Sequence, residues 1–239
     1  MPAPIRAILF DKDGTLIDFE QTWGPAYRQA ARKVADYAGQ PGLETELLEA
    51  GGWCRESNSW RAGSLLASGS NEQIIECWKQ LINDRRRQDI ENLVTRTFFE
   101  HAANAPAPLC GINELIPLLN ANQFVLGVAT MDDENIATRS LGVLGLSQYF
   151  KFICGADSGF GIKPEAGMVH GFCRQCGLQT GEVLMIGDSP HDLNMGRAAG
   201  VGLVVGVLSG AHDAGVLNPL ADYVITDATR LPSLLGIAA

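Results

Sequence analysis

Residues 5–15 read IRAILFDKDGT, a run that is apolar apart from Arg6 and that gives way at once to a stretch with two carboxylates and a glycine. A short, continuous apolar run of this kind is typical of a buried strand in a parallel sheet. Asp11 and Asp13 lie two positions apart, and Gly14 lets the backbone turn away after them. Residues at this spacing can face one ligand. The stretch therefore predicts a strand that ends at a polar site.

The same pattern recurs in the second half of the chain. Apolar runs occupy residues 124–129 (FVLGVA), 152–154 (FIC), 183–186 (VLMI), 203–208 (LVVGVL) and 223–225 (YVI). Helical segments separate these runs, which predicts an α/β fold with a doubly wound, Rossmann-like parallel sheet. Ligands of such sheets bind beyond the carboxyl ends of the strands. Asp11, Thr130, Lys163 and Asp188 fall at or near these ends.

The alternation of strands and helices stops after the first strand. Helical patterns cover residues 25–38 and 43–50, and Ser70 with Gln73 forms a capping box that opens a further helix. A linker that contains two prolines, APAP at 105–108, follows.

These boundaries predict two domains. We expect residues 1–15 and 106–239 to form the α/β core, and residues 16–105 to form an inserted α-helical cap domain.

Composition narrows the class of protein. The 239 residues include 18 Lys+Arg and 27 Asp+Glu, for a net charge of −9, and 46% are hydrophobic. This acidic balance argues against nucleic acid as the main partner, because phosphate backbones are held largely by Lys and Arg. No apolar run approaches the ~18 residues needed to cross a membrane. The apolar run at the N-terminus is too short for a secretory signal. We therefore expect a cytoplasmic protein.

Acidic residues also follow the strand at 183–186, in the stretch GDSPHD (187–192) that contains Asp188 and Asp192. Carboxylates that converge at one sheet edge repel each other unless a cation neutralises them, and oxygen ligands suit Mg²⁺. The alternative is that Asp11 and Asp188 only cap helices or turns. Their matching positions after strands favour a shared site.

Thr130 and Lys163 supply groups that can bind an anion. A hydroxyl and an ammonium at neighbouring strand ends could hold a phosphoryl group against the cation. The alternative for Lys163 is a solvated surface lysine, but its place after the glycine-containing loop GFGI (159–162) favours the site.

Four motifs in a fixed order carry a family resemblance: DKDGTLID (11–18), Thr130 after a strand, Lys163-Pro164 and GDSPHD (187–192). They resemble the motifs of the haloacid dehalogenase superfamily, and the position of the cap is similar to the phosphoglycolate phosphatase branch. The chain departs from the family pattern at Met131, where Asn is common, and at Ala166, where Pro is frequent.

The resemblance implies a phosphatase. Asp11 would attack phosphorus and form an aspartyl phosphate, which splits one difficult step into two. Asp13 would protonate the leaving alcohol and then activate the water. Thr130 and Lys163 would hold the oxygens of the transferred phosphoryl group.

The resemblance also implies a Mg²⁺ cofactor. Asp11, the backbone carbonyl of Asp13 and Asp188 would bind the ion, with Asp192 as a further ligand or a neighbour of the ligands. The ion would let an anionic carboxylate approach an anionic phosphate.

The substrate would be a small phosphorylated metabolite of the phosphoglycolate type. Arg55 or Arg61, in glycine-containing loops of the cap, could bind a second anionic group of the substrate, although each could equally be a surface arginine. The alternatives are a phosphohexose mutase resembling β-phosphoglucomutase and a non-catalytic phosphate-binding protein. Asp13 argues against carbon–halogen chemistry, because true dehalogenases generally lack this second Asp. We expect a monomer or a homodimer.

Overall fold

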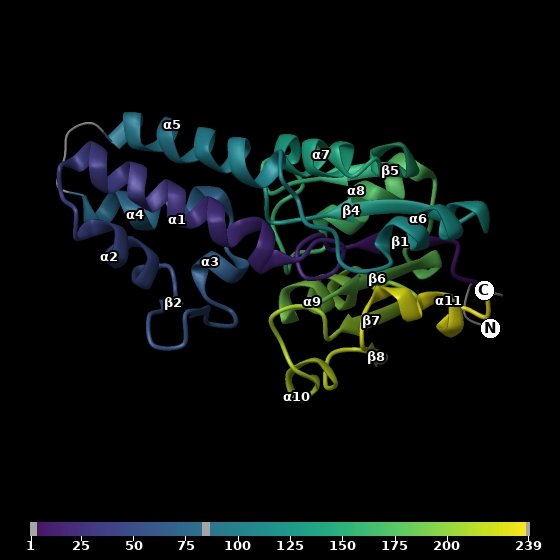
Figure 1. The fold of residues 1–239 in the computed structure, drawn as a ribbon. Helices are drawn as coiled ribbons and strands as arrows, with labels where there is room; N and C mark the ends of the chain where they lie inside the picture. Colours follow the sequence, from purple (N-terminus) through teal and green to yellow (C-terminus); the bar gives the residue numbers. More distant parts are fainter. Residues whose placement is uncertain (1–3, 83–86, 238–239) are drawn as a thin grey trace.

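The structure is a computed structural model that describes residues 4–82 and 87–237. Its central feature is a parallel sheet of six strands in the order β5-β4-β1-β6-β7-β8 (Figure 1). The strands are β1 (Ala7–Phe10), β4 (Val125–Ala129), β5 (Phe150–Cys154), β6 (Val183–Gly187), β7 (Leu203–Val207) and β8 (Tyr223–Ile225). The predicted doubly wound parallel sheet is therefore confirmed.

Strand β1 lies in the middle of the sheet, between β4 and β6, and is fully buried. Its side chains alternate between the two faces. Ile8 and Phe10 pack into one apolar cluster, and Ala7 and Leu9 pack into another. Burial on both faces explains why the run is continuously apolar.

Helices cover both faces of the sheet. Side chains of α6 (Ile112–Ala121) and α7 (Glu134–Val143) join the cluster of Ile8, and side chains of α8 (Gly167–Cys176) and α9 (Pro190–Ala199) join that of Leu9. The remaining short elements of the core are 3₁₀ turns at Ser147–Tyr149, Thr180–Glu182 and Ala228–Arg230, and the helices α10 (Ala214–Leu217) and α11 (Leu231–Leu234).

The segment between β1 and α6, called the cap below, is mainly helical. It contains α1 (Phe19–Ala38), α2 (Leu43–Ala50), α3 (Leu65–Ser68), α4 (Asn71–Leu81), α5 (Arg87–Phe98) and a π-helical turn at Phe99–Ala103. Trp23, Trp78 and Phe98 are buried at its centre, with the ring of Phe98 edge-on to both indoles. The predicted capping box of Ser70 and Gln73 is present. The residue boundaries of the two domains stay a prediction.

Two details of the cap differ from expectation. Helix α1 begins at Phe19 rather than at residue 25, because Asp18 caps it by accepting a hydrogen bond from Gln21 N. Pro25 lies inside the helix and leaves only the carbonyl of Gln21, one turn earlier, without its usual donor. A small antiparallel hairpin, β2 (Trp53–Cys54) with β3 (Ser59–Trp60), joins α2 to α3.

The cap stands beside the carboxyl ends of the strands (Figure 1). Its entry and exit segments run side by side: Asp18 N donates to Ala107 O, and Leu109 N donates to Leu16 O. Ile136 of α7 packs into the apolar cluster of the cap. Helix α1 therefore begins close to the edge of the sheet where Asp11 and Asp13 lie.

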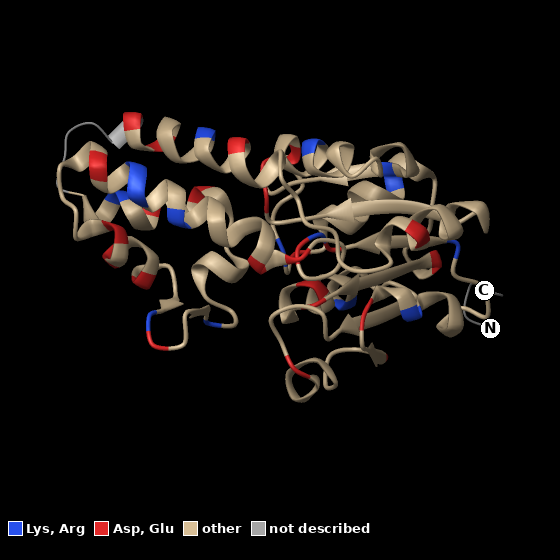
Figure 2. Cartoon of the chain, in the orientation of Figure 1, with Lys and Arg blue, Asp and Glu red and all other residues tan. Residues whose placement is uncertain are grey.

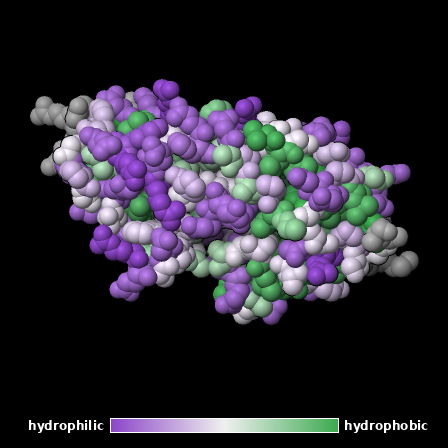
Figure 3. All heavy atoms as spheres, viewed as in Figure 1, coloured by the Kyte–Doolittle hydropathy of each residue, from purple (hydrophilic) through white to green (hydrophobic). Residues whose placement is uncertain are grey.

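The surface of the cap is largely hydrophilic in the space-filling view, whereas hydrophobic residues gather over the α/β part (Figure 3). Acidic and basic residues are interspersed along α1 and α5 (Figure 2). Glu100, for example, pairs with both Lys33 and Arg96. Among the described residues, no helix is long and apolar enough to span a membrane.

Candidate active site

Three buried carboxylates meet at the carboxyl edge of the sheet. Asp11 follows β1 and Asp188 follows β6, and these strands are paired so that Phe10 lies opposite Ile186. Asp192 lies in the first turn of α9. Each carboxylate offers one oxygen, and these three atoms lie within 4.8 Å of one another. The structure therefore brings together residues that are up to 181 positions apart in the sequence.

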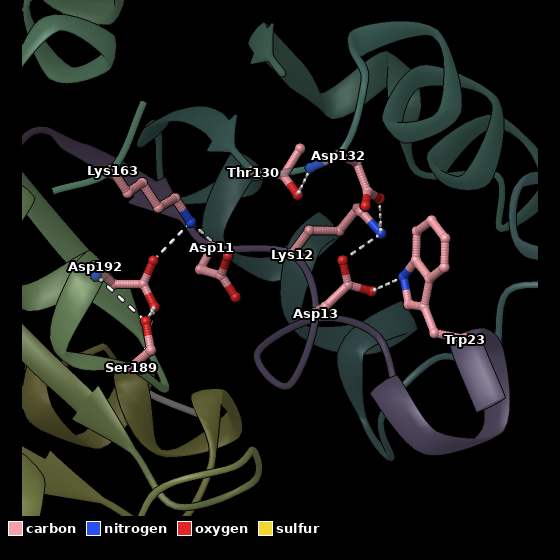
Figure 4. Close-up of polar contacts among 9 residues, drawn as sticks. All are labelled: Asp11, Lys12, Asp13, Trp23, Thr130, Asp132, Lys163, Ser189 and Asp192. Carbon is pink, nitrogen blue, oxygen red and sulfur yellow. Dashed lines mark hydrogen bonds and ion pairs between the residues drawn. The ribbon is translucent and has the colours of Figure 1, made fainter. Parts of the chain in front are cut away.

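Lys163 lies between two of these acids (Figure 4). Its Nζ is 2.6 Å from Oδ1 of Asp11 and 2.6 Å from Oδ1 of Asp192. The other oxygen of Asp192 accepts hydrogen bonds from the hydroxyl and the backbone N–H of Ser189. Burial alone would lower the pKa of Lys163, but the two carboxylates outweigh it and raise this pKa above its usual value. Lys163 is therefore held as an ammonium.

The acids carry more negative charge than one ammonium can offset. Burial, reinforced by the charge of Asp192, raises the pKa of Asp11 to about 7, although Lys163 opposes this. Burial and the charges of Asp11 and Asp192 raise the pKa of Asp188 well above its usual value. Each carboxyl therefore loses its proton less readily than in water.

The side chains present fit a divalent cation. Oδ2 of Asp11 is buried and accepts no hydrogen bond from any described residue. Gly14 and Gly210 lie against the Asp188 carboxylate so closely that a Cβ on Gly210 would be 1.9 Å from its Oδ2. Carboxylate oxygens with unused lone pairs are the ligands that Mg²⁺ prefers, so Asp11 and Asp188 could hold such an ion.

Thr130 completes the side of the site opposite Asp188. It follows β4, is almost fully buried, and its Oγ1 accepts a hydrogen bond from Asp132 N. Asp11, Thr130, Lys163 and Asp188 all line one cavity with an empty volume of about 540 Å³, part of it open to solvent. Cap residues complete its wall: Phe19, Trp23, Tyr27, Leu66, Ala67, Ser68 and Gly69.

Asp13 belongs to a second group of polar residues next to the first (Figure 4). Its Oδ1 accepts a hydrogen bond of 2.9 Å from the indole Nε1 of Trp23. Its Oδ2 lies 2.7 Å from Nζ of Lys12, which also lies 2.7 Å from Oδ2 of Asp132. Burial alone would lower the pKa of Lys12, but the neighbouring carboxylates of Asp13 and Asp132 together outweigh it and raise this pKa above its usual value.

No sequence pattern indicated Lys12, Trp23 or Asp132 as site residues. The available signal for Lys12 was its place between two predicted site residues, two positions after a fully apolar strand. Asp132 follows Met131, one of the departures from the family pattern. Trp23 precedes the predicted start of its helix, so nothing in the sequence placed it near Asp13.

The two arginines proposed from the sequence lie elsewhere. Arg55 and Arg61 are both exposed, one after β2 and the other after β3. Neither is among the described residues that line the cavity of Asp11. Their predicted role in substrate binding therefore gains no support from this arrangement of the cap.

Comparisons with known proteins agree with this geometry. A sequence model described as haloacid dehalogenase-like hydrolase matches residues 5–200. A phosphoglycolate phosphatase of Chromobacterium violaceum is 27% identical, over 97% of this chain and 96% of the relative. A pyrophosphatase, PpaX, of Halalkalibacterium halodurans is 28% identical, over 98% of this chain and 99% of the relative.

Solved structures share the fold. The crystal structure of a putative β-phosphoglucomutase from Thermotoga maritima superposes with a TM-score of 0.70 at 18% identity. The match covers 97% of this chain and 99% of the other. The cap and the core therefore occur together in a protein of similar length.

Proposed function

We propose that this chain, which belongs to the haloacid dehalogenase-like hydrolase family, is a Mg²⁺-dependent phosphatase. It hydrolyses a small phosphorylated metabolite, and the phosphoryl group is carried transiently by Asp11. One observation carries this proposal. Asp11 has one oxygen bound to Lys163 and the other, Oδ2, buried at the cavity without a hydrogen-bond partner among the described residues. A carboxylate held in this way is oriented and keeps lone pairs on both oxygens, so that one oxygen can face the cation while the other attacks phosphorus.

The reaction proceeds in two steps. In the first, an oxygen of Asp11 forms a bond to phosphorus, the bond from phosphorus to the ester oxygen breaks, and Asp13 donates a proton to the leaving alcohol. In the second, Asp13 takes a proton from a water molecule, whose oxygen bonds to phosphorus as the bond to Asp11 breaks. Inorganic phosphate leaves, and both aspartates return to their starting states.

Lys163 and Thr130 would bind the phosphoryl oxygens. The Lys163 ammonium is fixed by two carboxylates and is buried, so little reorganisation is needed when charge develops on these oxygens. The Thr130 hydroxyl accepts a hydrogen bond from Asp132 N, which leaves its own proton available for donation.

Asp11, Asp188 and the backbone carbonyl of Asp13 would hold the Mg²⁺ ion, with Asp192 as a further ligand or a neighbour. The bound ion supplies positive charge that offsets the repulsion between these carboxylates and a phosphate. Both oxygens of Asp192 already accept hydrogen bonds, from Lys163 and Ser189. This favours the second role for Asp192, as a support for Lys163.

Phosphoglycolate is the first substrate to test. A relative that covers nearly the whole chain bears that name, and the sequence resemblance points to the same branch. Two further compounds should be tested as substrates. Inorganic pyrophosphate is suggested by the name of the PpaX relative, and a hexose phosphate by the mutase structure. A cytoplasmic location and a monomeric or homodimeric state stay predictions.

Phosphate release from these compounds, measured with Mg²⁺ and with a chelator, tests the proposed function. We expect Mg²⁺-dependent release from at least one phosphate ester and a loss of at least about a thousandfold in Asp11→Asn. Conversion of a hexose phosphate into its isomer without phosphate release would instead support a mutase. Turnover that persists in Asp11→Asn would exclude Asp11 as the nucleophile.

A further inference from the structure

We propose that Trp23 is a positioning residue: the indole N–H of the cap orients the carboxyl group of Asp13 for proton transfer. This inference rests on the proposed function, in which Asp13 is the acid and base. The contact that carries it runs from Nε1 of Trp23 to Oδ1 of Asp13, at 2.9 Å. It is a hydrogen bond between the cap and the core, made directly to a residue that would exchange protons with the substrate.

Asp13 is held at both of its oxygens. Trp23 donates to Oδ1, and Lys12 lies 2.7 Å from Oδ2. A hydrogen bond from the indole N–H to one oxygen and an ion pair with the ammonium at the other restrict the plane of the carboxyl group, and each oxygen keeps a lone pair for the reacting proton. If the indole N–H is removed, the carboxyl group can rotate about its remaining contact with Lys12.

Lys12 is itself fixed, so the freedom of Asp13 depends on Trp23. The ammonium of Lys12 is fully buried and lies 2.7 Å from Asp132 on its other side. Lys12 therefore cannot follow Asp13 without leaving a second buried carboxylate unpaired, which is costly. Lys12 and Asp132 form a rigid support, and Trp23 supplies the second point of attachment.

The indole is in turn held by the cap. Trp23 is 1% exposed, its ring stacks on Tyr27 with centroids 5.2 Å apart, and Phe98 meets it edge-on at 5.5 Å. Rings packed in this way do not reorient independently of their helices. The orientation of Asp13 is therefore tied to the position of α1, so proton transfer is most efficient when the cap lies where it does here.

Three variants separate orientation from packing. Trp23→Phe keeps an aromatic ring against Tyr27 and Phe98 but removes the N–H. Trp23→His keeps the five-membered ring, with Nε2 in the place of Nε1, and so restores a donor while losing more apolar volume. Trp78→Phe is the matched control, because Trp78 is equally buried in the cap and donates its N–H to Leu47 O, away from the site.

The measurement compares an alkyl phosphate, glycerol 1-phosphate, with an aryl phosphate, p-nitrophenyl phosphate, in the presence of Mg²⁺. A phenolate leaves without help from an acid, whereas an alkoxide needs a proton. We expect Trp23→Phe to lower kcat for the alkyl phosphate by about tenfold or more, with KM changed less than about twofold. On the aryl phosphate, a burst of phenolate should precede slow turnover, because water attack still needs Asp13. Trp23→His should recover much of the alkyl activity in spite of its lower stability.

The outcomes are distinct. Wild-type kinetics in Trp23→Phe, or equal losses on both substrates without a burst, would overturn the role of Trp23. Equal losses of kcat in Trp23→Phe and Trp78→Phe would show that the effect comes from packing of the cap. This result would also overturn the role of Trp23. If Trp23→Phe does not fold, Trp23→His tests the inference alone. A kcat for the alkyl phosphate that is about a hundredfold lower in Trp23→His than in Trp78→Phe would then contradict the role of Trp23. Turnover retained in Asp11→Asn would instead refute the proposed function.

Discussion

Lys163 and Asp11 are separated by 152 positions in the sequence, yet Nζ of Lys163 lies 2.6 Å from Oδ1 of Asp11. The same Nζ lies 2.6 Å from Asp192, and all three side chains are buried. One ammonium therefore stabilises two buried carboxylates that would otherwise repel each other without a cation. This contact connects the stability of the site to its chemistry.

Removing this ammonium should affect both properties. Lys163→Met leaves Asp11 and Asp192 buried without their cation, which costs about 3–5 kcal/mol in comparable sites. We expect a loss of this size in the free energy of unfolding of the metal-free protein, and a decrease in kcat of about a hundredfold or more. Urea denaturation and phosphate release measure the two effects. Lys151→Met, at an exposed position of β5, is the control and should change stability by less than about 0.5 kcal/mol. A Lys163→Met protein as stable as wild type would contradict this view of the pair.

The close contact between Gly210 and Asp188 predicts an effect on the metal requirement. A Cβ on Gly210 would lie 1.9 Å from Oδ2 of Asp188, so Gly210→Ala must displace this carboxylate. We expect the Mg²⁺ concentration that gives half-maximal activity to rise by about tenfold or more, as for other changes next to metal ligands. Gly181→Ala is the control, since no atom of the described residues, apart from Gly181 and its two chain neighbours, lies within 4 Å of its added Cβ. An unchanged Mg²⁺ requirement in Gly210→Ala would argue against Asp188 as a ligand.

The ion pair of Lys12 and Asp132 should appear as a coupling energy. Lys12→Met leaves two carboxylates without their cation, and Asp132→Asn leaves Lys12 with Asp13 alone. We expect the double variant to lose less stability than the two single variants together, with a coupling of about 1–3 kcal/mol. A double-mutant cycle by urea denaturation at pH 8, above the pKa of about 7 of Asp132, gives this value for the ionised pair. A coupling near zero would show that the buried pair contributes nothing.

Asp132 also predicts a dependence of stability on pH. Burial, opposed by Lys12, raises the pKa of Asp132 from 3.8 to about 7 in the folded protein. Between these values the unfolded chain has lost this proton while the folded chain keeps it, so the free energy of unfolding falls as the pH rises. Relative to Asp132→Asn, wild type should therefore lose stability between pH 4 and pH 7 and change little above. Denaturation of both proteins across this range tests the sign, and a relative gain for wild type would refute it.

Much of the fold and part of the site can be predicted from the sequence, for one physical reason. Buried parallel strands are recognisable as short apolar runs, and their carboxyl ends must share one edge of the sheet. Asp11 and Asp188 could therefore be placed together from their positions after such runs. Thr130 follows the same rule, and the structure places all three at one cavity.

Contacts between the cap and the core could not be predicted in this way. The position of Trp23 depends on where α1 begins and on its direction, and the proline at position 25 suggested a later start. Lys12 and Asp132 pair across two strand ends, so each lacks a local pattern that indicates its partner. The positions of Arg55 and Arg61 relative to the cavity could not be predicted either, because the positions of their loops depend on the packing of the whole cap.

The most direct test is to identify the residue that carries the phosphoryl group during turnover. The protein would be mixed with Mg²⁺ and p-nitrophenyl phosphate, quenched in acid within the first turnovers, digested and analysed by mass spectrometry. The central claim predicts one added phosphoryl group on the peptide that contains Asp11, at a higher level in Trp23→Phe and absent from Asp11→Asn. A phosphoryl group on another residue, or rapid phosphate release by Asp11→Asn, would contradict it.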